Sequence, residues 1–256
     1  METNRRILIA GNWKMNGLKA DARRWAEAAS KADASTPNEV ALFPPFPWLG
    51  TVGDILGAPD GSVGLGGQCC HTQPYGAYTG SISAGMLKDA GCRYVLCGHS
   101  ERRHLGGETD VVVAESLTRA LEEGLVPILC VGETLEERKA ARARDVVLRQ
   151  VDAGLDALTS PDAPLVIAYE PVWAIGTGLS ASPEEAAGAH AWIRTRVAER
   201  DAKRAQGLRI LYGGSVKPGN IGGLLASPDV DGALVGGAAL DPEAFGALIR
   251  ATPDPA

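Results

Sequence analysis

The sequence predicts an α/β fold, a single-domain (β/α)8 barrel over residues 1–256 with a loose C-terminal tail at residues 251–256. Short apolar runs rich in β-branched residues recur along the chain, and stretches with helical periodicity separate them. This alternation indicates βα units and a parallel sheet. Eight strand and helix pairs in about 250 residues fit a closed barrel better than an open, doubly wound sheet.

The predicted elements follow one another in a regular order. Strands are expected at residues 7–13, 40–43, 63–67, 94–97, 126–131, 165–169, 209–212 and 232–235. Helices are expected between them at residues 19–32, 47–56, 83–90, 110–123, 135–158, 183–202, 218–226 and 242–249. Ser182 before Pro183 and Asp241 before Pro242 pair an N-cap residue with a proline in the first turn. Gly124 is placed to end a helix before the next strand.

Composition and charge exclude several classes of protein. The chain has 31 acidic and 25 basic residues, a formal charge of −6, and its arginines are scattered among acids, so we expect no nucleic-acid surface. No apolar stretch reaches membrane-spanning length, and the first apolar run is too short for a signal peptide, so we expect a cytoplasmic protein that does not bind membranes. Five cysteines without Cys-x-x-Cys spacing indicate reduced thiols.

Polar residues fall at the carboxyl ends of the predicted strands. Asn12 and Lys14 lie at the end of the first strand, His99 follows the fourth, and Glu170 follows the sixth. Because the carboxyl ends of parallel barrel strands converge on one face, these four side chains are expected to meet around one mouth. The pattern therefore predicts an active site there.

Two of these residues are suited to proton transfer. Glu170 follows a buried run and precedes Pro171, so an extended backbone would hold its carboxylate against apolar walls as a general base. Position alone equally allows a glutamate that pairs with an arginine or caps a turn. His99, if neutral and with its pKa lowered at the start of a helical turn, could pass protons between adjacent substrate oxygens. A structural histidine is the alternative.

Metal binding and covalent chemistry are further alternatives at the same face. Cys97, His99 and His104 lie close in sequence, but their spacing matches no familiar zinc pattern, so we expect no metal. Lys14 could steady a developing negative charge, form a Schiff base or point to solvent. We expect no cofactor.

Three glycine-rich segments could bind a phosphate group through backbone amides. They are Gly176-Thr177-Gly178, Gly213-Gly214-Ser215 and Gly236-Gly237, and each follows a predicted strand. A single Gly-Gly is usually only a turn, but barrels commonly hold phosphate in the loops after their last two strands. Residues 171–178, which start directly after Glu170 and have an apolar tip, are interpreted as a lid that excludes water.

Five motifs resemble those of the triosephosphate isomerase family, in order and over essentially the whole chain. They are Gly11-Asn12-Trp13-Lys14-Met15-Asn16, Gly98-His99-Ser100-Glu101-Arg102-Arg103, Ala168-Tyr169-Glu170-Pro171-Val172-Trp173-Ala174-Ile175-Gly176-Thr177-Gly178, Tyr212-Gly213-Gly214-Ser215-Val216 and Asp231-Gly232-Ala233-Leu234-Val235-Gly236-Gly237-Ala238. The resemblance implies a TIM barrel and an isomerase that interconverts dihydroxyacetone phosphate and D-glyceraldehyde 3-phosphate through an enediolate, in glycolysis and gluconeogenesis.

The resemblance also implies individual roles. Glu170 would be the base, His99 the electrophile, and Asn12 and Lys14 electrostatic partners, assignments that general accounts of this family already contain. The residues expected to bind substrate are Asn12, Lys14, Gly176, Ser215, Gly236 and Gly237, with Glu101 and Cys130 supporting the site from behind.

The resemblance further implies a homodimer held by the loop at residues 68–82. Cys69 and Ser81 depart from the family, where Asn or Asp and an acidic residue are usual, so the strength of this contact is open. A same-family isomerase acting on a four-carbon ketose phosphate is the nearest alternative function. A Schiff-base aldolase using Lys14 and a non-catalytic phosphate-binding module are more distant ones.

Overall fold

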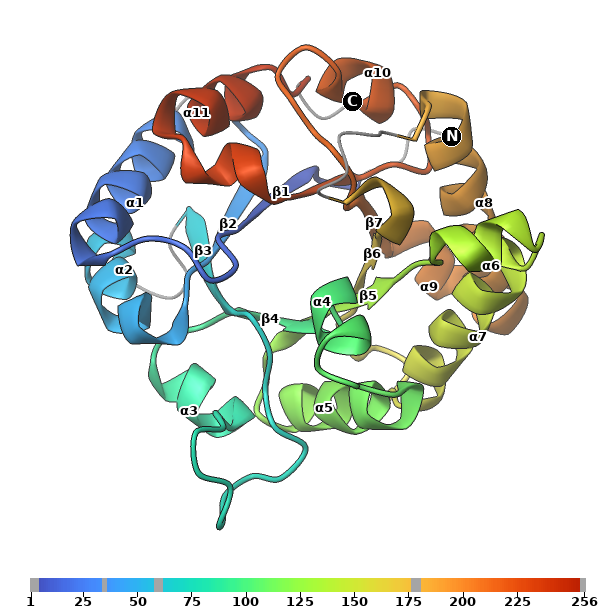
Figure 1. The fold of residues 1–256 in the computed structure, drawn as a ribbon, viewed down its shortest axis with the longest axis horizontal. Coiled ribbons are helices and arrows are strands. Elements are labelled where there is room, and N and C mark those ends of the chain that lie inside the picture. The colour runs from blue at the N-terminus through green and yellow to red at the C-terminus, as the bar shows by residue number, and fades with distance from the viewer. Residues whose placement is uncertain (1–4, 34–35, 58–61, 176–180, 254–256) are drawn as a thin grey trace.

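The computed structural model describes residues 5–33, 36–57, 62–175 and 181–253, and in them eight parallel strands close into a barrel (Figure 1). The strands are β1 (Leu8–Asn12), β2 (Glu39–Phe43), β3 (Val63–Gly67), β4 (Tyr94–Cys97), β5 (Val126–Val131), β6 (Val166–Tyr169), β7 (Arg209–Tyr212) and β8 (Gly232–Val235). Neighbours in sequence pair in space, and β1 pairs with β8 to close the ring, with Leu8 opposite Gly232. The predicted barrel is confirmed.

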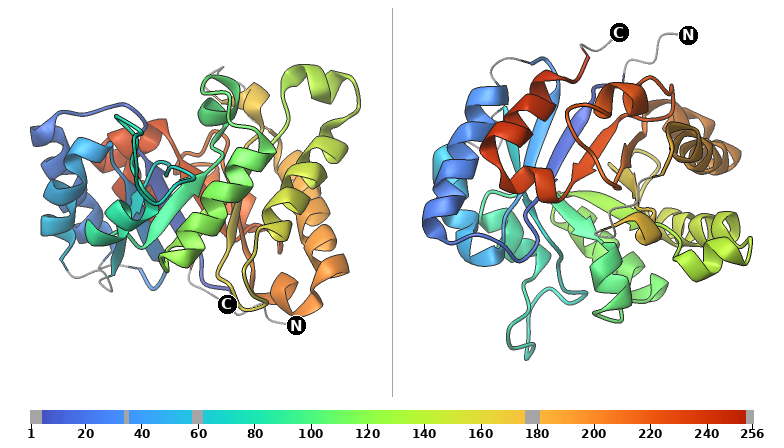
Figure 2. Two further views of the ribbon diagram at one scale, coloured as in Figure 1. Left: turned by 90° about the horizontal axis from the view of Figure 1, so that it is seen from below. Right: turned by 45° about the horizontal axis from the view of Figure 1, so that its top comes forward.

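Helices surround the strands as an outer layer (Figures 1 and 2). The longer ones are α1 (Lys19–Asp33), α2 (Leu49–Leu56), α5 (Asp110–Glu122), α7 (Ala143–Asp156), α8 (Pro183–Arg200) and α11 (Pro242–Arg250). Shorter segments are α3 (Ala84–Asp89), α4 (Ser100–His104), α6 (Leu135–Lys139), α9 (Ala202–Gly207), α10 (Ile221–Leu225) and the 3-10 turns η1 (Phe46–Trp48), η2 (Val172–Ala174) and η3 (Gly237–Leu240). No helix in the described ranges is both long and apolar enough to cross a membrane.

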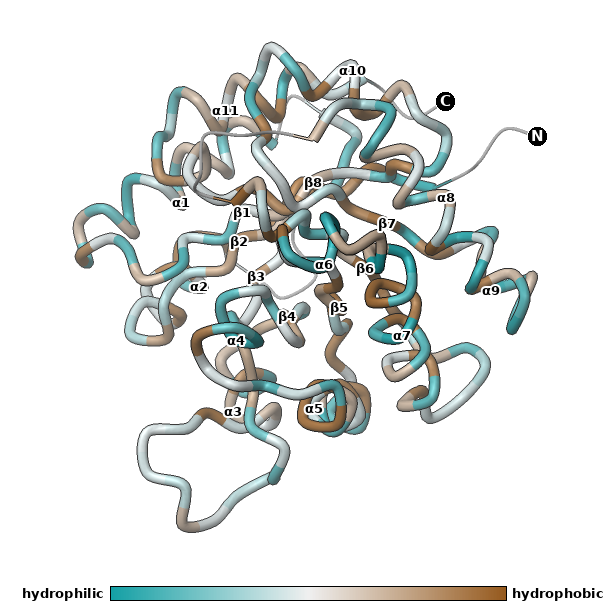
Figure 3. The backbone as a smooth tube through the Cα atoms, turned by 45° about the vertical axis from the view of Figure 1, so that its right-hand side comes forward, coloured by the Kyte–Doolittle hydropathy of each residue, from teal (hydrophilic) through white to brown (hydrophobic). Residues whose placement is uncertain are grey.

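Alternation along each strand decides which side chains face the barrel axis. In β1, Leu8 and Ala10 belong to the inner core, whereas Ile9 packs in the outer core between strands and helices. Hydrophobic stretches can be seen along β5 and β7 (Figure 3). Because the side-chain period of a strand is two, Asn12 continues the inward series and emerges at the carboxyl end of the barrel.

The amino end of the barrel contains an ion cluster around the buried Glu39. Arg93 and Arg209 contact its two carboxylate oxygens at 2.9 and 2.5 Å, and the hydroxyl of Tyr94 donates a hydrogen bond to it. These four groups fill the end of the barrel opposite Asn12, where one carboxylate lies between two guanidinium groups.

Two of the predicted helices differ from those in the structure. The segment expected at residues 135–158 divides into α6 and α7, with Ala141 between them at a positive φ of 56°. The helix expected at residues 183–202 ends at Arg200, and the side chain of Asp201 accepts a hydrogen bond from the amide of Arg204 and so begins α9, a helix that was not predicted.

The segment after Arg250, expected to be loose, is held by the body of the protein over its first residues. The side-chain amide of Asn38 donates hydrogen bonds to the hydroxyl of Thr252 at 3.0 Å and to the carbonyl of Pro253 at 2.8 Å. Residues 254–256 lie outside the described part of the chain.

Candidate active site

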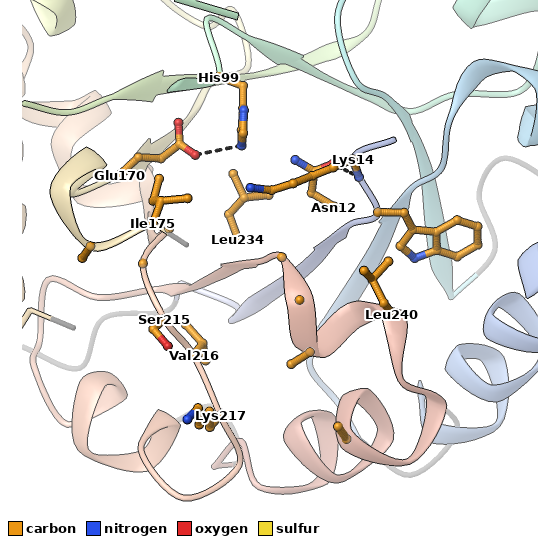
Figure 4. A pocket seen from close by; sticks show the side chains of 18 of the residues that line it. Asn12, Lys14, His99, Glu170, Ile175, Ser215, Val216, Lys217, Leu234 and Leu240 are labelled. Atoms are coloured by element: carbon orange, nitrogen blue, oxygen red, sulfur yellow. Dashed lines mark hydrogen bonds and ion pairs between the residues drawn. The ribbon is translucent and has the colours of Figure 1, made fainter. Parts of the chain in front are cut away.

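A pocket of about 740 Å³ opens at the carboxyl ends of the strands, where the predicted residues meet (Figure 4). Asn12, Lys14, His99 and Glu170 point into it from one side, and Ser215 lies across the pocket from them. The lining also includes Trp13, Asn16, Ala174, Ile175, Gly213, Gly214, Val216, Lys217, Pro218, Leu234, Gly236, Gly237, Ala238, Leu240 and Ala244. Groups that are distant in sequence therefore share one cavity.

Glu170 faces inward because it continues the series Val166 and Ala168 along β6. One carboxylate oxygen accepts a hydrogen bond from the amide of Ser100 at 2.8 Å, and the other lies 3.0 Å from Nε2 of His99. Burial raises the pKa of Glu170, but the attraction of His99, the amide of Ser100 and Lys14 outweighs it, so the pKa is lowered from its usual 4.5. The carboxylate is therefore held in its basic, ionised form.

Gly213 allows this position of the glutamate. A Cβ atom at Gly213 would lie 2.8 Å from Cγ of Glu170, and the amide of Gly213 donates to the carbonyl of Tyr169 at 2.7 Å. The loop after β7 thus packs directly against the side chain of the candidate base.

His99 is the N-cap residue of α4, and its two ring nitrogens have different partners. Nδ1 accepts a hydrogen bond from the amide of Glu101 at 3.3 Å, so the proton of the neutral ring is assigned to Nε2, which donates to Glu170. The predicted lowering of its pKa is wrong in this arrangement. Burial does lower the pKa of His99, but Glu170 and Glu101 together raise it above 6.5 because the carboxylate of Glu170 touches the ring.

Lys14 is held in an unusual backbone conformation beside the base. The φ angle of Lys14 is 51°, in a region of backbone conformation that few residues other than glycine adopt. The side chain of Asn12 accepts a hydrogen bond from the backbone amide of Lys14 at 2.9 Å. Gln68 donates to the carbonyl of Lys14 at 2.7 Å, and the ammonium group of Lys14 contacts Glu101 at 2.7 Å. Glu101 therefore aims the lysine into the pocket, and Gln68, which the sequence argument did not single out, fixes its backbone.

The opposite side of the pocket is built from small residues. Ser215, Gly236 and Gly237 line it, and a Cβ at Gly236 would lie 3.5 Å from Cε of Lys14. Lys217 adds a second positive charge to the lining. Gly176, Thr177 and Gly178, predicted to bind phosphate and to form part of the lid, lie outside the described residues.

Glu133 organises the segment that follows the base, and the sequence argument missed it. Its buried carboxylate accepts hydrogen bonds from the hydroxyl of Tyr169 at 3.1 Å, from Nε1 of Trp173 at 2.8 Å and from Arg138 at 3.2 Å. Its carbonyl accepts from the amide of Val172. Its position just beyond β5 is the same signal that identified His99 and Glu170, so the rule of strand ends could have found it.

The remaining predicted residues lie around the pocket. Cys130 lies beneath Glu170 in the inner core, and burial, reinforced by the carboxylate, raises the pKa of its thiol well above 9.0. Cys97 packs in the outer core and His104 is exposed, so they do not share a site with His99. In the part of the chain that the structure describes, no group of three or more His, Cys, Asp or Glu side chains is arranged to hold a metal ion.

This arrangement can move a proton within the pocket, where the side chains of His99 and Glu170 are both buried. An ionised carboxylate lies beside an N–H donor and an ammonium group, and these two could stabilise an oxyanion formed when the carboxylate removes a proton from carbon. Backbone amides across the pocket could hold an anionic group of the same molecule.

Comparison with known proteins matches the whole barrel. The family model described as triosephosphate isomerase matches residues 7–252. A triosephosphate isomerase from Halorhodospira halophila is 53% identical over 249 residues, which are 96% of this chain and 98% of the relative. One from Thermus thermophilus is 49% identical, covering 96% of this chain and 98% of the relative, and one from Herminiimonas arsenicoxydans is 50% identical, covering 96% and 99%.

Proposed function

Because this chain belongs to the triosephosphate isomerase family, we propose a role for each group around the pocket. The enzyme is an aldose–ketose isomerase that interconverts dihydroxyacetone phosphate and D-glyceraldehyde 3-phosphate, a step of glycolysis and gluconeogenesis. The observation that carries the proposal is the contact between His99 and Glu170 inside a pocket that also contains Lys14.

Glu170 acts as the base. It removes a proton from the carbon next to the substrate carbonyl and returns it to the neighbouring carbon, so that the enediolate is the intermediate between ketose and aldose. To reach that carbon the carboxylate must leave the amide of Ser100 and the ring of His99, which hold it in the substrate-free arrangement. Because its pKa is lowered, the carboxylate of Glu170 is ionised at neutral pH and can accept a proton.

His99 and Lys14 stabilise the intermediate. The Nε2–H group of His99 donates a hydrogen bond to Glu170 when the site is empty and to the oxygens of the enediolate once Glu170 turns to the carbon. Lys14 and Asn12 add positive charge and a hydrogen bond from the end of β1. Ser215, Gly236, Gly237 and Gly176 bind the phosphate group, a role that the glycine backbone and the position of the first three support.

The purified chain in a coupled assay tests this function. Turnover with dihydroxyacetone phosphate and glyceraldehyde 3-phosphate, at rates well above those with a four-carbon ketose phosphate, is the expected result. The reverse preference would identify the four-carbon substrate as the natural one and contradict the triose assignment.

We also propose that the enzyme works as a homodimer in the cytoplasm. The loop at residues 68–82 extends away from the barrel beyond α3 (Figure 1) and exposes Tyr75 by 83%, while Met15 beside the active site is 94% exposed. A cleft of about 600 Å³ at the root of the loop, lined by Cys69, Thr79 and Glu108 among others, could receive the same loop of a second copy. All five cysteines are free, which supports a reducing compartment.

Sedimentation at micromolar concentration tests the assembly. A species of twice the chain mass of 26.6 kDa is expected, and a monomer with full activity would contradict the proposal.

The departure at Cys69 does not introduce a reactive thiol, because burial raises its pKa to about 11.

A further inference from the structure

A fully buried histidine lies behind the two strands that carry the candidate base and the phosphate loop. His190 projects from the inner face of α8, and its ring meets Tyr169 of β6 edge to face, with centroids 5.9 Å apart and planes at 84°. The same ring is 6.4 Å from the ring of Tyr212 on β7, with planes at 36°. One imidazole therefore contacts the last residue of two neighbouring strands.

The chemical state of His190 suits a packing role. Nδ1 lies 3.1 Å from the carbonyl of Asp229, which can only accept, so the ring proton is assigned to Nδ1. Burial lowers the pKa of His190 to about 4, and the ring is neutral at neutral pH. Nε2 has no hydrogen-bond partner among the residues that the structure describes.

Both tyrosines are directly connected to the active site. Tyr169 precedes Glu170 in sequence, and its hydroxyl donates to Glu133, the carboxylate that also holds Trp173. Tyr212 precedes Gly213, which packs against Cγ of Glu170. A shift of either tyrosine would be transmitted to the base through one peptide bond or one contact.

We propose that His190 is a positioning residue for isomerisation: its ring, wedged against Tyr169 and Tyr212, sets where β6 presents Glu170 relative to the loop after β7. The inference rests on the proposed function of Glu170 as base. A planar aromatic ring suits the position because edge-to-face contacts with tyrosine are directional, whereas an aliphatic side chain would fill volume without fixing ring orientation. Small displacements at this distance from the chemistry are sufficient, since a 1 Å misplacement of a reacting group can cost about a hundredfold in rate.

Two substitutions separate the ring from its hydrogen bond. His190→Asn keeps an N–H donor for the carbonyl of Asp229 but removes the ring, and His190→Phe keeps a ring but removes the donor. Arg194 also donates to that carbonyl at 3.3 Å, so the Phe variant does not leave it without a partner. Val197→Ala, two turns along the same buried face of α8, is the control for a cavity in the helix that does not involve the tyrosines.

Three measurements on each full-length variant test the inference: kcat and KM, inhibition by inorganic phosphate, and hydrogen exchange of residues 169–174. For H190N we expect kcat to fall roughly tenfold, with KM and phosphate inhibition within about twofold of the wild type and faster exchange in that segment. H190F should keep kcat within about threefold, and V197A should lower the melting temperature without changing kcat or the exchange of residues 169–174.

Equal kcat and equal exchange in H190N and V197A would overturn the inference, as would an H190F variant as slow as H190N. Failure of the proposed function has a different signature: the wild type itself would not isomerise triose phosphates. The exchange of residues 169–174 would then still decide whether the ring of His190 holds this segment.

Discussion

Each end of the barrel contains a buried glutamate with a lowered pKa, and the two differ in their partners. At the amino end, Glu39 contacts the guanidinium groups of Arg93 and Arg209, which stay charged at any working pH, and the hydroxyl of Tyr94. At the carboxyl end, Glu170 is held by an imidazole, whose charge depends on pH, and by one backbone amide, and it borders the pocket.

The difference shows what separates a structural carboxylate from a candidate base. Both oxygens of Glu39 contact permanent charges, so the carboxylate is fixed in place and has no partner with which to exchange a proton. The partners of Glu170 are weaker, and one of them can change its own protonation, so a substrate can replace them. Burial and a lowered pKa are common to both sites and do not distinguish them.

The strongest test of this comparison removes the charge of Glu170. In Glu170→Gln we expect turnover to fall at least roughly 10²–10⁴-fold, as is typical when a general base is lost, with the fold intact. The coupled isomerase assay and a thermal melt measure the two effects. A folded E170Q enzyme with near-normal turnover would contradict the assignment of the base.

Removing the imidazole tests whether His99 keeps Glu170 ionised. His99→Asn should slow turnover roughly 10²–10³-fold because a preorganised donor to the intermediate is lost. A base with a lowered pKa is active above that pKa and is lost as pH falls through it, so the part of the wild-type kcat/KM profile that reports Glu170 should lie below pH 4.5. Without His99, burial raises the pKa of Glu170, and the acid limb should move to higher pH. An unmoved limb would show that the imidazole does not control the base.

Glu133 joins the base strand to the segment after it, and its loss should have an intermediate effect. Glu133→Gln replaces one acceptor oxygen by an NH2 group, which is a donor. Tyr169, Trp173 and Arg138 all donate to this carboxylate, so one of these donors would face another donor in the variant. We expect roughly tenfold slower turnover and more inorganic phosphate released per turnover, because water would reach the enediolate. Unchanged phosphate release in a slowed E133Q enzyme would argue against this protective role.

The smallest effect on turnover is expected at the other end of the barrel. Glu39→Gln should leave turnover within about twofold of the wild type but lower the free energy of unfolding at pH 7 by about 3 kcal/mol, because two arginines lose a largely buried partner. Since the folded-state pKa of Glu39 is lowered from 4.5, its stabilisation is complete above that value and is lost as pH falls through the folded pKa.

Urea unfolding at neutral and acidic pH therefore checks both parts of this prediction. The difference in stability between wild type and E39Q should shrink as the solution is acidified below pH 4.5. A difference that stays constant with pH, or a large loss of turnover, would remove the distinction between the two ends of the barrel.

Elements whose signal is local could be predicted from the sequence, and elements that depend on distant contacts could not. The strand β3 was expected at its observed bounds because glycines and a short apolar run mark it. The break between α6 and α7 was missed, because Ala141 carries no signal for a positive φ. Glu101 was expected to support the site and contacts Lys14, whereas the pairing of Glu133 with Trp173 joins two loops that only the closed barrel brings together.

The sequence by itself determined the barrel and the face on which the site lies, since hydrophobic periodicity and the residues that end each strand are properties of short segments. It also determined the family, because five motifs in order specify it. The tertiary structure alone decided the arrangement of the site: which nitrogen of His99 faces Glu170, the direction in which the pKa of Glu170 is shifted, and the place of His190 behind two tyrosines. These features depend on distances between atoms that are far apart in the chain. The free energy of a charge interaction or a ring contact is set by those distances and not by the order of residues.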